Sequence, residues 1–289
     1  MGLFDGCLLA SDIDGTLMIN GYINPKNIEA ISFFLKEGGA FSLSTGRTVV
    51  AVDMVIRELG NISPSVVANG SMIYDFSKKE ILYEECIPKE DYYIAKKISE
   101  LDGDISIEIH AADKVLVLKE NQEEIDHREY EEFSVETVSF KEACKYNWNK
   151  VLFLFTDKED LKEAKKVVSG CETKSSYFVD TTTTIKGRKR EYYEQIPVGI
   201  SKASALDRLC NILDIKKGCL FAIGDYYNDL EMIKKADIGA ALVDSPKDIK
   251  QAAEYITVKC DDGAVADFID YLYSVKGRKS FHTKKRKEG

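Results

Sequence analysis

The sequence contains no apolar stretch that approaches the ~20 residues needed to cross a bilayer. Its first residues also lack a basic segment followed by an apolar one, the pattern of a secretion signal. We therefore expect a cytoplasmic protein with no membrane partner. No internal repeat or low-complexity linker interrupts the 289 residues, a length that suits two domains or one large one.

Histidine and paired cysteine motifs are also scarce. Only His110, His127 and His282 occur, and they are scattered along the sequence, without a Ser–His–Asp or histidine-rich zinc pattern. Acid–base chemistry is therefore expected to rely mainly on carboxylates and lysine. The seven cysteines are odd in number, widely spaced and without a Cys-x-x-Cys pair, which favours buried free thiols in a reducing cytosol over metal binding or disulfides.

The chain has no excess of positive charge. It carries 40 lysines and arginines against 49 aspartates and glutamates, a formal net charge of −9, which argues against nucleic acid as a partner. An anionic substrate stays possible, because a metal ion and a lysine can reverse the local field. Residues 276–289 at the end of the chain are rich in lysine and arginine; they predict a solvated, frayed tail, with weak contact to an anionic surface as the alternative.

Two acidic residues, Asp12 and Asp14, follow a short apolar run at residues 8–10. The run is too short for a helix and lies between Gly6 and Gly15, which favours a buried strand. Ligands collect at the carboxyl ends of the strands of a parallel sheet. Because two close carboxylates are costly unless a cation joins them, the pair indicates either a divalent-metal site or only a solvated turn.

Three further segments bring polar groups to the ends of predicted elements. Residues 40–43 form a short apolar stretch that leads into STGR at 44–47, and residues 219–223 lead into GDYYND at 224–229. Lys202 stands at the start of a helical pattern. These segments would supply a hydroxyl, backbone N–H groups, a lysine and a second acidic cluster.

In this order, the segments closely resemble the four motifs of the haloacid dehalogenase superfamily of phosphohydrolases: DIDGTL (12–17), TGR (45–47), Lys202 and GDYYND (224–229). The motif spacing resembles that of the Cof-type sugar-phosphate phosphatases, which carry a large C2-type cap between the second and third motifs. Residues 67–75 (VANGSMIYD) look like a further signature of that branch. The resemblance spans about residues 7–272, with no departure at a motif position.

The order of predicted elements favours an α/β fold: a Rossmann-like, doubly wound parallel sheet with an inserted α+β cap. We expect a discontinuous core of residues 1–82 and 198–275, a cap of 83–197 acting as a substrate lid, and the tail from 276. The core pattern predicts helices over 25–36, 49–59 and 246–253 and strands over 40–44, 66–68 and 239–243. The cap pattern predicts a hairpin of 105–109 and 115–118, strands over 150–155, 177–179 and 192–196, and a helix over 159–168.

The motif residues have distinct expected roles. Asp12 is the candidate nucleophile, because a carboxylate can form an aspartyl-phosphate. The resemblance implies that Asp14 is general acid for the departing alcohol and then general base for water. Lys202 would neutralise the nucleophile and the transferring phosphoryl group. Thr45 and Gly46 would bind phosphate near a helix start, although Thr45 could simply cap that helix.

The remaining candidates are metal ligands and supporting residues. Asp12, the Asp14 backbone carbonyl and Asp225 would hold a metal, and all-oxygen ligands favour Mg²⁺. Asp229 is either a further ligand or the residue that holds Lys202. Three weaker expectations complete the set: Asn228 touches phosphate, Arg47 reaches substrate or pairs with a surface acid, and Asn69 lines the site or only forms a turn.

The expected function is that of a Mg²⁺-dependent phosphatase acting on small phosphomonoesters, either sugar phosphates or phosphorylated cofactors. A phosphomutase on the same fold is one alternative. A catalytically silent ligand-binding homologue is another, but the intact motif residues argue against it. The sequence gives no information on oligomeric state.

Overall fold

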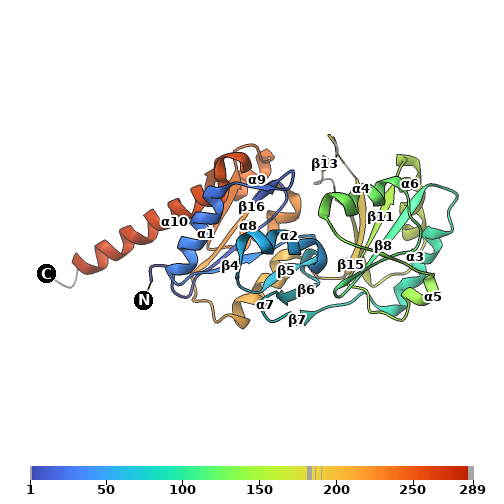
Figure 1. Ribbon diagram of the computed structural model, residues 1–289, viewed down its shortest axis with the longest axis horizontal. Helices are drawn as coiled ribbons and strands as arrows, with labels where there is room; N and C mark the ends of the chain where they lie inside the picture. The colour runs from blue at the N-terminus through green and yellow to red at the C-terminus, as the bar shows by residue number, and fades with distance from the viewer. Residues whose placement is uncertain (1, 181–183, 186, 190, 286–289) are drawn as a thin grey trace.

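Five parallel strands form the central sheet of the core, in the order β18-β17-β16-β1-β4 (Figure 1). They are β1 (Leu8–Ser11), β4 (Ala40–Leu43), β16 (Leu220–Gly224), β17 (Ile238–Leu242) and β18 (Tyr255–Thr257). The computed structural model describes residues 2–180, 184–185, 187–189 and 191–285. Within them, this parallel sheet with its covering helices confirms the predicted α/β class.

Side chains of β1 alternate between two apolar layers. Leu9 packs in a layer with three helices, whereas Leu8 and Ala10 pack in a layer with two others. The helices of the first layer are α1 (Pro25–Lys36), α2 (Val49–Leu59) and α10 (Cys260–Lys285), and those of the second are α7 (Lys202–Ile212) and α8 (Leu230–Lys235). Because both faces of the sheet are covered, its strands are short and mainly apolar.

Helix α1 illustrates how local sequence sets an element. Pro25 lies in the first turn, where its missing N–H costs nothing. The Asn24 side chain caps the helix by accepting the N–H of Lys26 at 3.0 Å. Ile31 and Phe34, one turn apart, are buried against the sheet.

The segment predicted as a strand at 66–68 only partly joins the parallel sheet. A single parallel bridge links Ser44 to Val66. Otherwise β5 (Ser65–Val67) pairs antiparallel with β6 (Met72–Asp75), which pairs with β7 (Glu80–Glu84). Residue 68 instead begins a 3₁₀ turn, and this turn carries Asn69 to the carboxyl edge of the sheet. A small hairpin, β2 (Met18–Ile19) and β3 (Tyr22–Ile23), follows the first motif.

The cap is a six-stranded sheet in the order β10-β9-β8-β11-β15-β12, with most of its helices on its outer face (Figure 1). Its strands are β8 (Ile105–Ala111), β9 (Lys114–Val117), β10 (Glu136–Thr137), β11 (Lys150–Phe155), β12 (Ser175–Asp180) and β15 (Tyr192–Pro197), and β13 (Thr184–Ile185) pairs separately with β14 (Arg188–Lys189). Its helices are α3 (Tyr92–Ser99), α4 (Gln122–Glu131), α5 (Phe140–Ala143) and α6 (Lys158–Ser169). The predicted cap hairpin, strands and helix are confirmed within a few residues at each end.

Along the cap strands, side chains alternate between the two faces of the cap sheet, and this alternation decides which residues face the core. Ile107 and Phe153 pack under the outer helices. Glu108, His110 and Lys150 take the opposite face and are buried against the core. The alternating pattern of β8 is typical of a strand with one wet face; here the polar face lies at the domain interface.

The chain enters the cap after β7 and returns after β15, through a connection at residues 198–201. The remaining core helix, α9 (Lys247–Ala252), confirms the prediction over 246–253. The segment predicted to fray continues α10 as far as Lys285, and residues 286–289 lie outside the described part of the chain. In the described ranges, no helix combines the length and apolar character needed to span a membrane.

Candidate active site

The first motif lies at the carboxyl end of β1, in the cleft between core and cap. Asp12 is 5% exposed, and its N–H donates to the Ile223 carbonyl of β16 at 3.0 Å. Gly15 then turns the chain with φ +85°, and a Cβ there would lie 2.8 Å from Asp225 Oδ2. Glycine therefore allows the fourth motif to approach the first. Thr16 holds the two together by donating to Asp225 Oδ1 at 2.9 Å.

Lys202 joins the first motif to the fourth. It is the first residue of α7, behind a capping box made by Ser201 and Ser204. Its Nζ lies 2.7 Å from Asp12 Oδ1 and 2.7 Å from Asp229 Oδ1. Burial opposes its charge, but the two carboxylates outweigh burial and raise the pKa of Lys202 above its usual range. Lys202 is therefore an ammonium group between two buried carboxylates.

Asp229 uses both carboxylate oxygens within the protein. Oδ1 accepts from Lys202, and Oδ2 accepts the N–H of Asp225 at 3.1 Å. These contacts favour the holding role for Asp229 over that of a metal ligand. Both Lys202 and the loop that carries Asp225 depend on it for their position.

The acidic cluster fits a divalent cation. Carboxylate oxygens of Asp12, Asp225 and Asp229 lie within 4.8 Å of one another. Burial, followed by the charge of Asp229, raises the pKa of Asp12 well above its usual range and that of Asp225 to about 7. Raised pKa values mean that the ionised forms are poorly stabilised by the protein alone. A hard cation with oxygen ligands, such as Mg²⁺, would supply the missing positive charge.

The second motif follows β4. Thr45 is buried, and its Oγ1 accepts the Arg47 N–H at 3.1 Å. The N-cap of α2 is Thr48, so Thr45 does not cap that helix and the capping alternative is wrong. A Cβ on Gly46 would lie 3.0 Å from Asn69 Oδ1. Asn69 therefore packs directly behind the second motif, and it lines a neighbouring cavity.

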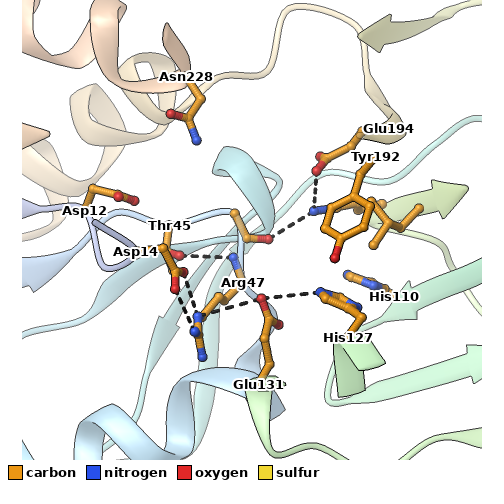
Figure 2. Close-up of a pocket in the computed structure, with 13 residues that line it drawn as sticks. Asp12, Asp14, Thr45, Arg47, His110, His127, Glu131, Tyr192, Glu194 and Asn228 are labelled. Atoms are coloured by element: carbon orange, nitrogen blue, oxygen red, sulfur yellow. Dashed lines mark hydrogen bonds and ion pairs between the residues drawn. The ribbon is translucent and has the colours of Figure 1, made fainter. Parts of the chain in front are cut away.

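Arg47 pairs with the predicted general acid. The Arg47 side chain is buried, with 3% of the residue exposed. It forms a bidentate ion pair with Asp14, in which Nη2 is 2.7 Å from Oδ1 and Nε is 2.8 Å from Oδ2 (Figure 2). The carboxylate that pairs with Arg47 is therefore Asp14 of the first motif and not an acid on the protein surface. Its Nε also lies 3.7 Å from Glu131 Oε1, at the end of cap helix α4. Arg47 therefore connects the cap to Asp14.

The cap supplies a charged cluster that sequence analysis missed. His127 Nδ1 lies 2.8 Å from Glu108 Oε1, and its Nε2 lies 3.4 Å from Glu131 Oε1. His110 Nε2 lies 3.2 Å from Glu108 Oε2. Two of the three histidines that are scattered in the sequence therefore meet at the site. One signal was available: Glu108 and His110 share a strand face, and His127 and Glu131 share a helix face.

His127 carries a charge at neutral pH. Burial opposes that charge, but Glu108 and Glu131 outweigh it and raise the pKa of His127 to about 10. The same contacts hold the pKa of Glu131 well below its usual range, although burial works in the other direction. The His127 imidazolium therefore balances the charges of Glu108 and Glu131. Glu131 also pairs with Arg47.

His127→Gln should therefore change how stability depends on pH. Because the folded-state pKa is raised, stabilisation by His127 is complete below about pH 6.5 and is lost as pH rises toward 10. We expect Tm of the variant to lie below wild type at pH 7 and the gap to narrow by pH 10, measured by thermal unfolding. Lys114→Gln, which breaks the exposed pair with Glu136, is the control. A gap that is constant with pH would contradict a charged His127.

A second polar bridge closes the cap on the core. Lys150 Nζ lies 2.9 Å from Glu194 Oε1 and 3.2 Å from the Gly46 carbonyl. Glu194 Oε2 accepts from Asn69 Nδ2 at 2.7 Å. A cavity of about 40 Å³, room for only a few waters, lies between the domains (Figure 2). It is lined by Asp12, Asp14, Thr45, Gly46, Arg47, His110, His127, Glu131, Lys150, Leu152, Tyr192, Glu194 and Asn228.

Comparison with known proteins supports the assignment made from motifs and geometry. The profile of the haloacid dehalogenase-like hydrolases matches residues 9–269. The chain belongs to this family. The structure of a haloacid dehalogenase-like hydrolase from Bacteroides thetaiotaomicron is similar to it, with a TM-score of 0.80 and 24% identity over 92% of this chain and 99% of that one. A sugar phosphatase of HAD subclass IIB has a TM-score of 0.74 and 22% identity over 92% and 98%.

Curated relatives agree with this haloacid dehalogenase-like assignment. The phosphatase YwtE of Bacillus subtilis (strain 168), named for 5-amino-6-(5-phospho-D-ribitylamino)uracil, is 27% identical over 292 residues, covering 92% of this chain and 98% of the relative. Phosphatase YwpJ of the same organism is 23% identical over 284 residues, covering 92% and 99%. The family and the enzyme class predicted from the sequence, a phosphoric monoester hydrolase, are thus confirmed.

Proposed function

We propose that this haloacid dehalogenase-like enzyme is a Mg²⁺-dependent phosphatase that hydrolyses small phosphomonoesters through an aspartyl-phosphate on Asp12. One observation carries the proposal: Asp12 lies buried at the end of β1, with Lys202 at 2.7 Å and the carboxylate of Asp225 beside it. A carboxylate held between an ammonium group and a cation site is suited to attack phosphorus without repelling the phosphate.

In the first half-reaction, one Asp12 oxygen forms a bond to phosphorus as the bond to the leaving oxygen breaks. The Lys202 ammonium offsets charge on the nucleophile and on the phosphoryl oxygens. The Thr45 hydroxyl, the Gly46 N–H and the Asn228 amide donate to the remaining oxygens. Asn228 lines the cavity, and its buried Oδ1 has no hydrogen-bond partner in the described chain, so the protein does not fix the amide elsewhere.

Asp14 then handles the proton. It donates to the departing alkoxide and later takes a proton from the water that cleaves the acyl phosphate. Arg47 keeps this carboxyl oriented. Asp12, the Asp14 carbonyl and Asp225 would hold Mg²⁺, which when bound supplies charge neutralisation at the phosphate. Asp229 keeps Lys202 and the Asp225 loop in place.

The cap would select the substrate by polar contacts. His110, Lys150 and Glu194 face the cavity beside the phosphate site, which favours a leaving group rich in hydroxyl or amide groups. A second cavity of about 470 Å³ shares Asn228 with it and is lined largely by apolar and aromatic side chains, Phe178 among them. This space supports a phosphorylated cofactor, which carries a ring system beside its phosphate-bearing chain. The compound in YwtE's name likewise joins a phosphorylated ribityl chain to a uracil ring.

A panel of sugar phosphates and phosphorylated cofactors, assayed for phosphate release with Mg²⁺ present, tests the proposal. We expect release from several compounds and a preference for those with a polar chain next to the phosphate. A phosphomutase would isomerise a sugar phosphate while releasing little phosphate. Absence of both reactions across the panel would contradict the proposed chemistry.

Arg47→Lys should slow the reaction by about 10- to 100-fold in kcat, since a hydrogen bond to a charged group is worth ~1.5–3 kcal/mol and lysine cannot form the bidentate pair. The loss in kcat/KM, which covers only the transfer of the phosphoryl group to Asp12, should be large with alkyl phosphates and small with p-nitrophenyl phosphate, whose leaving group needs no proton. Steady-state kinetics on both substrates measure this difference. Arg57→Lys, at the exposed pair with Asp53, is the matched control. Equal losses in kcat/KM on both substrates would contradict a role of Arg47 through Asp14.

A further inference from the structure

At the edge of the core sheet opposite the active site, two cysteines and a lysine meet. Cys7 directly precedes β1 and Cys219 directly precedes β16, and these strands pair side by side. Lys276, on α10, places Nζ 2.6 Å from Cys7 Sγ and 3.4 Å from Cys219 Sγ. The cluster therefore joins three segments that are far apart in the sequence.

The contact between Lys276 and Cys7 is too short for a hydrogen bond to sulfur. Elsewhere in this structure Lys97 Nζ lies 3.7 Å from Cys171 Sγ, and Asn149 Nδ2 lies 3.6 Å from Cys86 Sγ. Even the smaller oxygen acceptor sits at ~2.9 Å from an N–H donor. A separation of 2.6 Å is also too long for a direct N–S bond. It suits two atoms joined through one small bridging atom.

We propose that Cys7 and Lys276 are an oxidative cross-linking site, at which one oxygen atom bridges Sγ and Nζ as S–O–N. The oxidant is dioxygen. The Lys276 ammonium first releases one proton to water. The thiol then loses its hydrogen and the amine loses one of its two; one oxygen atom enters between sulfur and nitrogen, and the other leaves as water with both hydrogens. Sulfur and nitrogen each give up two electrons, which accounts for the four that dioxygen takes.

The surroundings fit such a site. Cys7 is fully buried, whereas Cys219 and Lys276 are half-buried, so a small oxidant can approach from their side while bulk thiols cannot reach the Cys7 sulfur easily. The Lys276 ammonium lies 5.5 Å from the centre of the Phe221 ring, which restrains its position. An exposed thiol is oxidised stepwise to sulfenic, sulfinic and sulfonic acid. Cys7 is buried beside a lysine nitrogen, so its oxidation can end in a bridge to that nitrogen.

The bridge would tie α10 to the first strand. Its ends are 269 residues apart, and a cross-link that closes so long a loop restricts the unfolded chain strongly. We expect oxidation to raise Tm by about 10 °C. Because the cluster lies at the amino ends of the strands, kcat should change little. The inference does not depend on the proposed phosphatase chemistry.

Peptide mass spectrometry of the full chain, equilibrated with oxygen or kept reduced, tests the site. The expected product links the Cys7 peptide to the Lys276 peptide with a mass gain of one oxygen less two hydrogens, and excess dithiol removes it once the chain is denatured. Lys276→Met should abolish the link and the Tm shift. Lys97→Met, which changes the lysine at the ordinary 3.7 Å contact, should retain both.

Three results would overturn the proposal: a Cys7–Cys219 disulfide, which lacks the added oxygen; sulfinic acid at Cys7 without a link; or unlinked peptides after prolonged exposure. Cys7→Ser provides a second loss-of-link variant. If Cys7→Ser does not fold, Lys276→Met alone decides the outcome, because its half-exposed position on α10 tolerates an unbranched apolar side chain.

Discussion

Asp12→Asn is expected to abolish phosphate release while leaving the fold intact. The asparagine amide oxygen can still accept from Lys202, but it cannot attack phosphorus as a carboxylate does. Loss of a nucleophile costs on the order of 10⁴-fold or more in kcat. Phosphate release in excess Mg²⁺ and thermal unfolding, both on the purified variant, separate loss of chemistry from loss of structure.

The stability of this variant gives an independent readout. Asp12 is buried beside Asp229 and Asp225, and their charges help to raise its pKa. Removing one of three crowded carboxylates should therefore raise Tm in the absence of divalent ions, by relieving repulsion. Asp53→Asn, on the exposed face of α2, should change neither activity nor Tm by much. Turnover like that of wild type would remove Asp12 as the nucleophile.

Elements of the core could be predicted where local signals and burial agree. Asn24 and Pro25 define the start of α1, and the apolar run at residues 8–10 defines a strand covered on both faces. The prediction of a strand at 66–68 was less accurate. The pairing of β5 depends on its hairpin partner β6 and not on the sequence of β5 alone. Local sequence does not contain that information.

The site residues also fall into a group that could be predicted from the sequence and a group that could not. Asp12, Thr45, Lys202 and Asp225 sit at the ends of parallel elements, so their meeting followed from the topology. The cap cluster did not follow, because Glu108 on β8 reaches His127 on α4 only through the packing of α4 on the cap sheet. Such contacts depend on tertiary geometry that one sequence does not reveal.

Removing divalent ions should be nearly as damaging as removing Asp12. EDTA is expected to reduce activity roughly 1,000-fold or more, since a metal Lewis acid supplies several kcal/mol of transition-state stabilisation, and added Mg²⁺ should restore it. The physical reason lies in the acidic cluster: in the described part of the chain, Asp12 and Asp229 share one cationic partner, Lys202. Ca²⁺, which prefers longer bonds and more ligands, should restore less.

The same ion should stabilise the folded protein in a pH-dependent way. The pKa of Asp225 is raised to about 7, so the metal-free native state keeps a proton that the unfolded chain releases near pH 4. Metal-free stability therefore falls as pH rises from about 4 to 7, and the Mg²⁺-induced rise in Tm should be larger at pH 8 than at pH 5. Asp225→Asn should lose this difference, whereas Asp248→Asn, at an exposed contact with Tyr227, should keep it. Full activity in EDTA together with a Tm that Mg²⁺ does not change would refute the metal site, because a cluster already neutral without the ion would have no use for it.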